Sequence, residues 1–177
     1  MRGVKYAAPD SVDDAVALLA EYGDRARMLA GGTDLIVQVR EWARDIDVMV
    51  DAKKISELMD ISFAGNGELT LGAATPCYRI YADDRIKDSY PALVDAVSMI
   101  GGTAVQGRAS VGGNLCNSGP AGDSIPPLIV YSVQCNIAGP SGRRSVPAED
   151  FCTGPGSNVL ESDELLVSLT FPPQDPG

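Results

Sequence analysis

The sequence predicts an α+β fold, because strand and helix patterns occupy separate stretches of the chain and do not alternate throughout. Residues 5–51 contain short apolar stretches separated by segments with apolar residues at helical spacing. Later in the chain, short apolar runs flank glycine-rich turns at residues 65–67 and 139–142, a pattern typical of β-hairpins. We therefore expect two subdomains, residues 1–55 and residues 56–177, with no flexible linker between them.

The first subdomain is predicted to run strand, helix, strand, helix, strand. Its strands are expected at residues 5–8, 27–30 and 47–51. The first helix is expected to begin after Ser11, with Asp14 three residues later as in a capping box, and to end at Gly23. Thr33 is expected to cap the second helix, because a threonine hydroxyl can accept a hydrogen bond from a free N–H group of the first turn.

The second subdomain is predicted to combine hairpins with helices. Its strands are expected at residues 61–63, 69–71, 134–138, 143–146 and 165–171. Helices are expected from about Tyr78, from Pro91, where proline suits the first helical position, and within residues 125–133. Residues 103–124 are rich in glycine, serine and asparagine, so we expect a loop there.

The composition argues against several classes of function. A formal net charge of −10 disfavours nucleic-acid binding, which requires a basic surface. No apolar run approaches the roughly 18 residues of a membrane-spanning helix and no signal peptide is expected, so the expected compartment is the cytoplasm. The chain has no histidine, and its four cysteines include no CxxC pair, so we expect no metal site and reduced thiols. Any catalysis would therefore depend on a bound cofactor.

A first glycine motif lies between a predicted strand and a predicted helix. It consists of Ala30, Gly31, Gly32, Thr33 and Asp34. The two glycines allow the backbone to approach a ligand closely, and the N–H groups of the first helical turn suit a pyrophosphate. An ordinary strand-to-helix turn is the alternative for this motif taken alone. The GxGxxG fingerprint and the phosphate-loop lysine are both missing, so a phosphate site here would belong to a different fold.

A second glycine motif follows about eighty residues later. It contains Ser110, Gly112, Gly113 and Asn114, and Asn117 and Asp123 come shortly after. A segment with so few bulky side chains can surround a flat ligand with main-chain N–H groups and short polar side chains. A glycine-rich surface loop is the alternative. Together, the two motifs favour a ligand that has both a pyrophosphate and a polar ring system.

These motifs resemble the paired flavin-binding motifs in the flavoprotein subunit of molybdenum hydroxylases, the xanthine dehydrogenase and carbon monoxide dehydrogenase type. That family carries Ala-Gly-Gly-Thr-Asp-Leu and Thr-Ile-Gly-Gly-Asn, and residues 30–35 and 110–114 are similar to them in order and spacing. The closing segment, residues 160–172, also matches. The resemblance implies a two-subdomain FAD-binding fold of the vanillyl-alcohol-oxidase-like (PCMH) type, with FAD held between the subdomains.

The resemblance also implies roles for individual residues, all in cofactor binding and none in catalysis or metal binding. Residues 30–34 would bind the pyrophosphate region. Ser110, Gly112, Gly113 and Asn114 would contact the phosphates and the ribityl chain. Asn117 and Asp123 would lie on the ring or ribose side, and Leu160 would pack near the isoalloxazine.

The implied partners are a large subunit with the molybdenum cofactor and a small subunit with two two-iron two-sulfur clusters, in a heterotrimer that dimerises. Electrons would pass from the clusters through FAD to NAD or another acceptor. Residues 104–109 depart from the family pattern except at Arg108, and the sequence ends near Pro173, where family members continue. Two alternatives stay open: a stand-alone flavin-dependent oxidase or dehydrogenase of the same fold, and an interaction protein without flavin.

Overall fold

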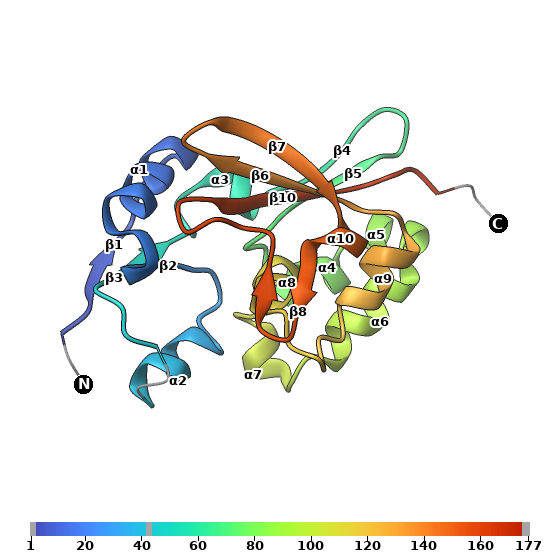
Figure 1. Ribbon diagram of the computed structural model, residues 1–177. Helices are drawn as coiled ribbons and strands as arrows, with labels where there is room; N and C mark the ends of the chain where they lie inside the picture. Colours follow the sequence, from blue (N-terminus) through green and yellow to red (C-terminus); the bar gives the residue numbers. More distant parts are fainter. Residues whose placement is uncertain (1–2, 42–43, 175–177) are drawn as a thin grey trace.

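The structure is a computed structural model that describes residues 3–41 and 44–174. A small parallel sheet and a larger antiparallel sheet lie next to each other, and most of the helices cover one face of the larger sheet (Figure 1). The predicted α+β class is confirmed. Within the described residues, no helix is long and apolar enough to cross a bilayer.

The first part of the chain forms a three-stranded parallel sheet with strand order β1-β3-β2. The strands are β1 (Lys5–Ala7), β2 (Ala26–Leu29) and β3 (Val48–Asp51). The helices are α1 (Val12–Tyr22), the 3-10 helix η1 (Gly23–Arg25) and α2 (Leu35–Arg40). The predicted order of strands and main helices is confirmed, and η1 is an addition to it.

The predicted boundaries of α1 are confirmed, whereas the predicted cap of α2 is wrong. Ser11 Oγ accepts a hydrogen bond from the backbone N–H of Asp14 at 3.1 Å, and Gly23 ends α1 with a φ of 51°. In contrast, α2 begins after Asp34, and no side chain caps it. The N–H group of Ile36 donates to the carbonyl oxygen of Gly32 at 3.2 Å, so the helix start is closed by a backbone contact in place of a side chain.

The larger sheet has five antiparallel strands in the order β4-β5-β10-β6-β7. They are β4 (Ile61–Phe63), β5 (Leu69–Gly72), β6 (Gln134–Gly139), β7 (Gly142–Pro147) and β10 (Leu165–Phe171). Both predicted hairpins are confirmed, as β4–β5 and β6–β7. A separate pair is formed by β8 (Cys152–Gly154) and β9 (Ser157–Asn158), which the sequence patterns did not indicate.

Strand β10, expected from the alternation within residues 165–171, is buried on both faces, whereas alternation by itself indicates one buried face. A β-bulge between Leu166 and Ser168 changes which face successive side chains reach. As a result, Leu166 and Phe171 pack into the larger hydrophobic cluster beneath the helices, and Leu165 and Val167 pack into a second cluster with α1 and the parallel sheet. That second cluster joins residues from both sides of the proposed subdomain boundary at residue 55, and the boundary itself stays a prediction.

The helices of the second part lie mainly on one face of the larger sheet (Figure 1). They are α3 (Ser56–Met59), α4 (Cys77–Ala82), α5 (Asp84–Ser89), α6 (Pro91–Met99), α7 (Thr103–Gln106), α8 (Val111–Asn117), α9 (Ile125–Val130) and α10 (Ala148–Phe151). The helices expected near Tyr78, at Pro91 and within residues 125–133 are confirmed.

The expectation of a continuous loop over residues 103–124 is wrong, because α7 and α8 lie within it. Ser110 caps α8: its Oγ accepts a hydrogen bond from the N–H of Gly113 at 3.1 Å. Glycine disfavours helices on entropic grounds, but here Gly112 lets α8 pack directly against Ala73. Tertiary packing therefore overrides the local preference for a loop.

Candidate functional site

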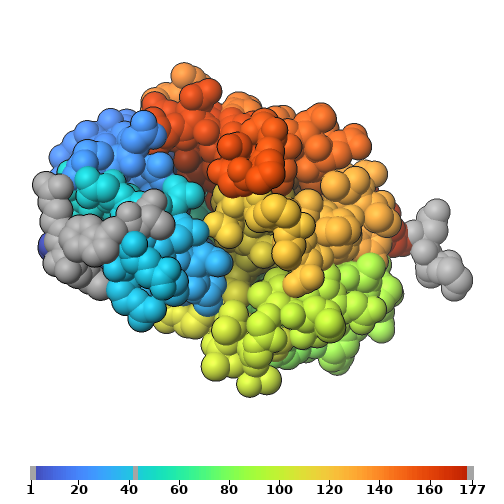
Figure 2. Space-filling view, turned by 60° about the horizontal axis from the view of Figure 1, so that its bottom comes forward, coloured from blue at the N-terminus to red at the C-terminus, as the bar shows by residue number. Residues whose placement is uncertain are grey.

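A pocket of about 370 Å³ lies between the first glycine motif, helix α8 and the segment that leads into β10. Figure 2 shows the hollow between the N-terminal part, in blue and cyan, and the yellow to red part of the chain. All but one of the predicted site residues line it: Ala30, Gly31, Gly32, Thr33, Asp34, Ser110, Gly112, Gly113, Asn114, Asn117 and Leu160. The structure therefore brings together two motifs that are about eighty residues apart in sequence.

Asp123 is the exception. Its side chain is exposed, and it is not part of the pocket lining. The next residue, Ser124, is fully buried, and its Oγ donates a 2.8 Å hydrogen bond to Oδ1 of Asn114. Sequence reasoning missed Ser124, which holds one of the predicted site residues in place. The role of Asp123 stays a prediction.

The first glycine motif presents unpaired hydrogen-bond donors to the pocket. Among the described residues, the backbone N–H groups of Gly31, Gly32, Thr33 and Asp34 have no hydrogen-bond partner. Gly32 has a φ of +77°, a conformation that L side chains rarely adopt, whereas φ at Gly31 is not in that region. Such a change in the sign of φ between neighbours is typical of backbone nests that bind anions.

The two glycines of this motif serve different purposes. A Cβ atom on Gly31 would lie 2.2 Å from the carbonyl oxygen of Arg108, so glycine is required there for the close approach of two backbones. A Cβ atom on Gly32 would meet the flexible side-chain ends of Ile36 and Leu29 at 2.8 and 2.9 Å. The prediction that both glycines serve the approach of a ligand is thus incomplete, because Gly31 is required by a close contact within the protein.

Polar side chains connect the two sides of the pocket. Gln38, on α2, donates from Nε2 to Oδ1 of Asn117 at 3.2 Å, and its Oε1 accepts a 2.6 Å hydrogen bond from Nε of Arg44. Gln38 and Arg44 both line the pocket. Neither was predicted, because nothing in the local sequence indicates a contact across 79 positions.

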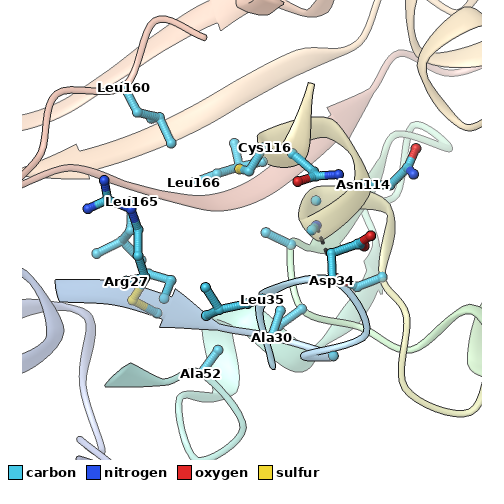
Figure 3. A pocket seen from close by; sticks show the side chains of 18 of the residues that line it. Arg27, Ala30, Asp34, Leu35, Ala52, Asn114, Cys116, Leu160, Leu165 and Leu166 are labelled. Atoms are coloured by element: carbon cyan, nitrogen blue, oxygen red, sulfur yellow. Dashed lines mark hydrogen bonds between the residues drawn. The ribbon is translucent and has the colours of Figure 1, made fainter. Parts of the chain in front are cut away.

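Two arginines, Arg27 and Arg44, line the pocket together with four acidic residues, Asp24, Asp34, Glu161 and Glu164. Arg27, on β2, extends toward the segment that carries Leu160 and Leu165 (Figure 3). Burial lowers the pKa of the Arg27 guanidinium, and the nearby charge of Arg44 lowers it further. A guanidinium in this setting favours an anionic or polar ligand group.

The rest of the wall is largely apolar. Leu35, Ile100, Cys116, Leu160 and Leu166 line the pocket, and Figure 3 shows Cys116, Leu160 and Leu166 on the side opposite Ala30. Burial raises the pKa of the Cys116 thiol to about 12, so this thiol stays protonated and uncharged at neutral pH. A pocket with apolar walls and a few placed polar groups is typical of sites for cofactors with aromatic rings.

The segment of residues 159–164, which brings Leu160 to the pocket, is held by one arginine of β7. Arg144 donates to both carboxylate oxygens of Glu164, at 2.7 and 2.6 Å, and to the carbonyl oxygen of Val159 at 2.9 Å. The same carboxylate accepts the backbone N–H of Glu161 at 3.0 Å. The hydrogen bond from Arg144 holds the pKa of Glu164 below its ordinary value of 4.5.

Replacing Arg144 with alanine is expected to loosen this segment while the fold is kept. The bidentate pair is partly exposed, so its loss should lower the free energy of unfolding by only about 1 kcal/mol. Hydrogen exchange of the amides in residues 159–164 should accelerate clearly more than the global stability change explains. Arg143→Ala is the matched control, because Arg143 pairs with Glu57 away from this segment.

The pH dependence of this exchange gives a second measurement. The pKa of Glu164 is lowered in the folded protein, so the Glu164 carboxylate stabilises the fold fully at a pH above 4.5, the ordinary pKa of this group. This stabilisation is lost as the pH falls through the lowered pKa. In the wild-type protein, the amides of residues 159–164 should therefore exchange faster in acid. In Arg144→Ala they should exchange faster already at neutral pH, because the contact with Glu164 is missing. Equal exchange in Arg144→Ala and Arg143→Ala at neutral pH would contradict this role.

The comparisons with known proteins agree with the geometry of the pocket. Residues 2–174 match the family described as the FAD binding domain in molybdopterin dehydrogenase. The chain belongs to this family. The resemblance stated from the two glycine motifs, the FAD-binding fold and FAD as the cofactor of the family are thereby confirmed.

Curated relatives of this FAD-binding domain include subunits of two dehydrogenases. The chain is 39% identical over 161 residues to a protein named xanthine dehydrogenase FAD-binding subunit of Escherichia coli O157:H7, covering 91% of this chain and 55% of the relative. It is 31% identical over 168 residues to the carbon monoxide dehydrogenase medium chain of Hydrogenophaga pseudoflava, covering 95% and 58%. The chain therefore spans somewhat more than half the length of these relatives.

Solved structures support the same conclusion about the FAD-binding domain. Carbon monoxide dehydrogenase from Hydrogenophaga pseudoflava superposes with a TM-score of 0.94 at 30% identity, covering 98% of this chain and 60% of that one. Quinoline 2-oxidoreductase from Pseudomonas putida 86 superposes with a TM-score of 0.91 at 28% identity, covering 96% and 59%. The similarity extends over nearly all of this chain.

The residues of the FAD-binding domain fit the chemistry of FAD. The unpaired N–H groups of the first glycine motif suit a pyrophosphate, the apolar wall suits a flat ring, and Arg27 and Asn117 offer polar contacts to the rest of the molecule. No cluster of potential metal ligands occurs within residues 3–41 and 44–174. The free N–H groups and the apolar wall of the pocket fit an organic cofactor, and the contacts of individual residues with it stay predictions.

Proposed function

We propose that this chain forms the FAD-binding part of the electron-transfer subunit of a cytoplasmic molybdenum-containing hydroxylase or dehydrogenase. The observation that carries the proposal is the set of unpaired N–H groups in the first glycine motif, which face α8 across a pocket with an apolar wall. The names of the relatives, an FAD-binding subunit and a medium chain, support a role within a larger assembly. The free cysteines of the described residues suit a reducing compartment.

In this proposal, residues 30–34 bind the pyrophosphate through backbone N–H groups. Gly112, Gly113 and Asn114 contact the phosphates and the ribityl chain. The Oγ of Ser110 already accepts from Gly113, so Ser110 acts by fixing the start of α8 as well as by facing the ligand.

The remaining predicted contacts concern the rings and the ribose of FAD. Asn117 reaches the ring or ribose side, where Gln38 orients its amide. Leu160 packs near the isoalloxazine. Asp123 would reach the same region only through a change of the exposed segment that carries it. Ile100, which the sequence analysis did not select, adds an apolar contact to the same cofactor.

The proposed assembly contains two further subunits. Bound FAD supplies the redox chemistry, and this chain's own residues bind the cofactor, orient it and exclude water from it. Electrons would arrive from the iron-sulfur clusters of a small subunit, which receives them from a large molybdenum subunit, and would leave to NAD or another acceptor. A heterotrimer that dimerises is the proposed arrangement.

Purification of the native protein through this chain tests the proposal. Denaturation followed by chromatography should release FAD in about one copy per chain, because a site built for a pyrophosphate has no partner in FMN. Native mass spectrometry of the same preparation should show a molybdenum-containing subunit and an iron-sulfur subunit. FMN or no flavin would overturn the cofactor assignment, and FAD without either metal-containing partner would favour a stand-alone flavoenzyme.

A further inference from the structure

A polar network contacts the backbone of the first glycine motif through side chains that are not part of the pocket lining. Lys53 donates from Nζ to the carbonyl oxygen of Ala30 at 2.9 Å and to Oδ1 of Asp51 at 2.9 Å. The backbone N–H of Lys53 donates to the same Oδ1 at 3.0 Å, and the hydroxyl of Tyr6 donates to the other carboxylate oxygen of Asp51. None of these three side chains lines the pocket, although Ala30 does.

The parallel sheet brings this network together. The C-terminal ends of β1, β2 and β3 lie at the same edge of the sheet, because all three strands run in the same direction. Tyr6 lies on β1, Asp51 ends β3 and Ala30 follows β2. The network therefore ties the first glycine motif to all three strands of its sheet.

Asp51 is held in its charged form at the centre of the network. Its residue is only 6% exposed, and burial by itself would raise the pKa of its carboxyl group. The hydrogen bonds from Tyr6 and Lys53 outweigh this effect and lower the pKa below its ordinary value. The carboxylate thus fixes the position of the Lys53 ammonium, which in turn contacts the motif.

A second cation holds the next carbonyl group of the motif. Arg108 donates from Nε to the carbonyl oxygen of Gly31 at 3.3 Å, and its side chain does not line the pocket. In a trans peptide, the carbonyl group and the following N–H group point in opposite directions. Lys53 and Arg108, which do not line the pocket, hold the carbonyl groups of Ala30 and Gly31, so the N–H groups of Gly31 and Gly32 point away from these two side chains.

We propose that Lys53, anchored by Asp51 and Tyr6, is a positioning residue that together with Arg108 orients the peptide groups of the first glycine motif toward a bound pyrophosphate. This inference rests on the proposed function, because it assigns a cause to the geometry of the same FAD site. Preorganised donors lower the cost of binding, since the protein does not reorganise when the ligand enters. The charge of Arg108 next to the motif also favours an anionic ligand group, whereas the charge of Lys53 is balanced by that of Asp51.

Lys53→Met tests this role, because methionine keeps much of the side-chain length and removes the ammonium group. Titration of the flavin-free whole protein with FAD, followed by flavin absorbance, should show a dissociation constant about tenfold higher than that of the wild type, or about 1.4 kcal/mol. The melting temperature of the flavin-free protein should fall by a few degrees, because the buried Asp51 carboxylate loses one partner. Lys53→Arg should restore most of the affinity, since arginine can donate to the same two acceptors.

Lys54→Met is the matched control. Lys54 is adjacent, carries the same charge and is largely exposed, and it lies 3.8 Å from a carboxylate oxygen of Asp10. It should leave the affinity for FAD unchanged. Equal affinities of Lys53→Met and Lys54→Met for FAD would overturn the positioning role. So would a loss of affinity in Lys53→Met that is explained by its lower melting temperature and that Lys53→Arg does not restore. Failure of the wild-type protein to bind FAD would instead overturn the proposed function.

Discussion

Gly31→Ala is expected to abolish the retention of FAD. The added Cβ atom would lie 2.2 Å from the carbonyl oxygen and 2.7 Å from the carbonyl carbon of Arg108, far inside any allowed contact. Both partners are backbone atoms, so the first glycine motif must move away from the second one. Because the pyrophosphate is proposed to bind where the two motifs meet, we expect affinity for FAD to fall more than about a hundredfold.

Flavin absorbance of the purified variant, relative to its protein absorbance, measures this loss. Gly65→Ala is a suitable control, because a Cβ atom on Gly65 would have no neighbour within 4 Å and its φ does not require glycine. The control should keep the wild-type flavin content. If Gly31→Ala retained one FAD per chain, the pyrophosphate could not depend on the contact between Gly31 and Arg108.

Gly112→Ala is expected to reduce both stability and flavin binding. Its Cβ atom would lie 2.4 Å from the carbonyl oxygen of Ala73 and 2.7 Å from the Cα atom of Ala73. Ala73 follows directly after β5, so it cannot move without disturbing the larger sheet. Helix α8 must therefore shift, at a cost of about 2–3 kcal/mol in the free energy of unfolding.

Denaturant unfolding of the flavin-free protein, together with an FAD titration, separates the two effects. Gly107→Ala provides the matched control, since its Cβ atom would meet only ordinary contacts, the nearest at 3.6 Å from the carbonyl oxygen of Ala104. It should change neither quantity measurably. Wild-type stability in Gly112→Ala would mean that α8 does not pack against Ala73 as described.

Much of the fold follows from local sequence patterns. The alternation within residues 165–171 and the glycine turns of the two hairpins predict strands that the structure contains. The cap formed by Ser11 depends only on residues three positions apart, so it could also be predicted. In contrast, α8 could not be predicted, because its glycines disfavour a helix and the packing of Gly112 against Ala73 is visible only in the folded structure.

The candidate site divides in the same way. Residues 30–34 and 110–114 stand out because two glycine pairs beside short polar residues together favour a ligand, although either motif alone could be an ordinary turn or loop. Lys53, Gln38 and Arg27 carry no such signal, since an isolated lysine, glutamine or arginine is usually solvated. Their roles depend on contacts with distant parts of the chain, such as the 2.9 Å contact of Lys53 with Ala30, and only the folded structure reveals them.

The central position of β10 has a consequence for how the protein folds. This strand comes last in its sheet in chain order, yet it pairs with β5 on one side and β6 on the other. Until it inserts, the two hairpins cannot join, and neither hydrophobic cluster is complete. Because such pairings close long loops, we expect assembly to be slow relative to a protein of similar size with mostly local contacts. The cofactor pocket should then form late, as a product of the last strand's insertion.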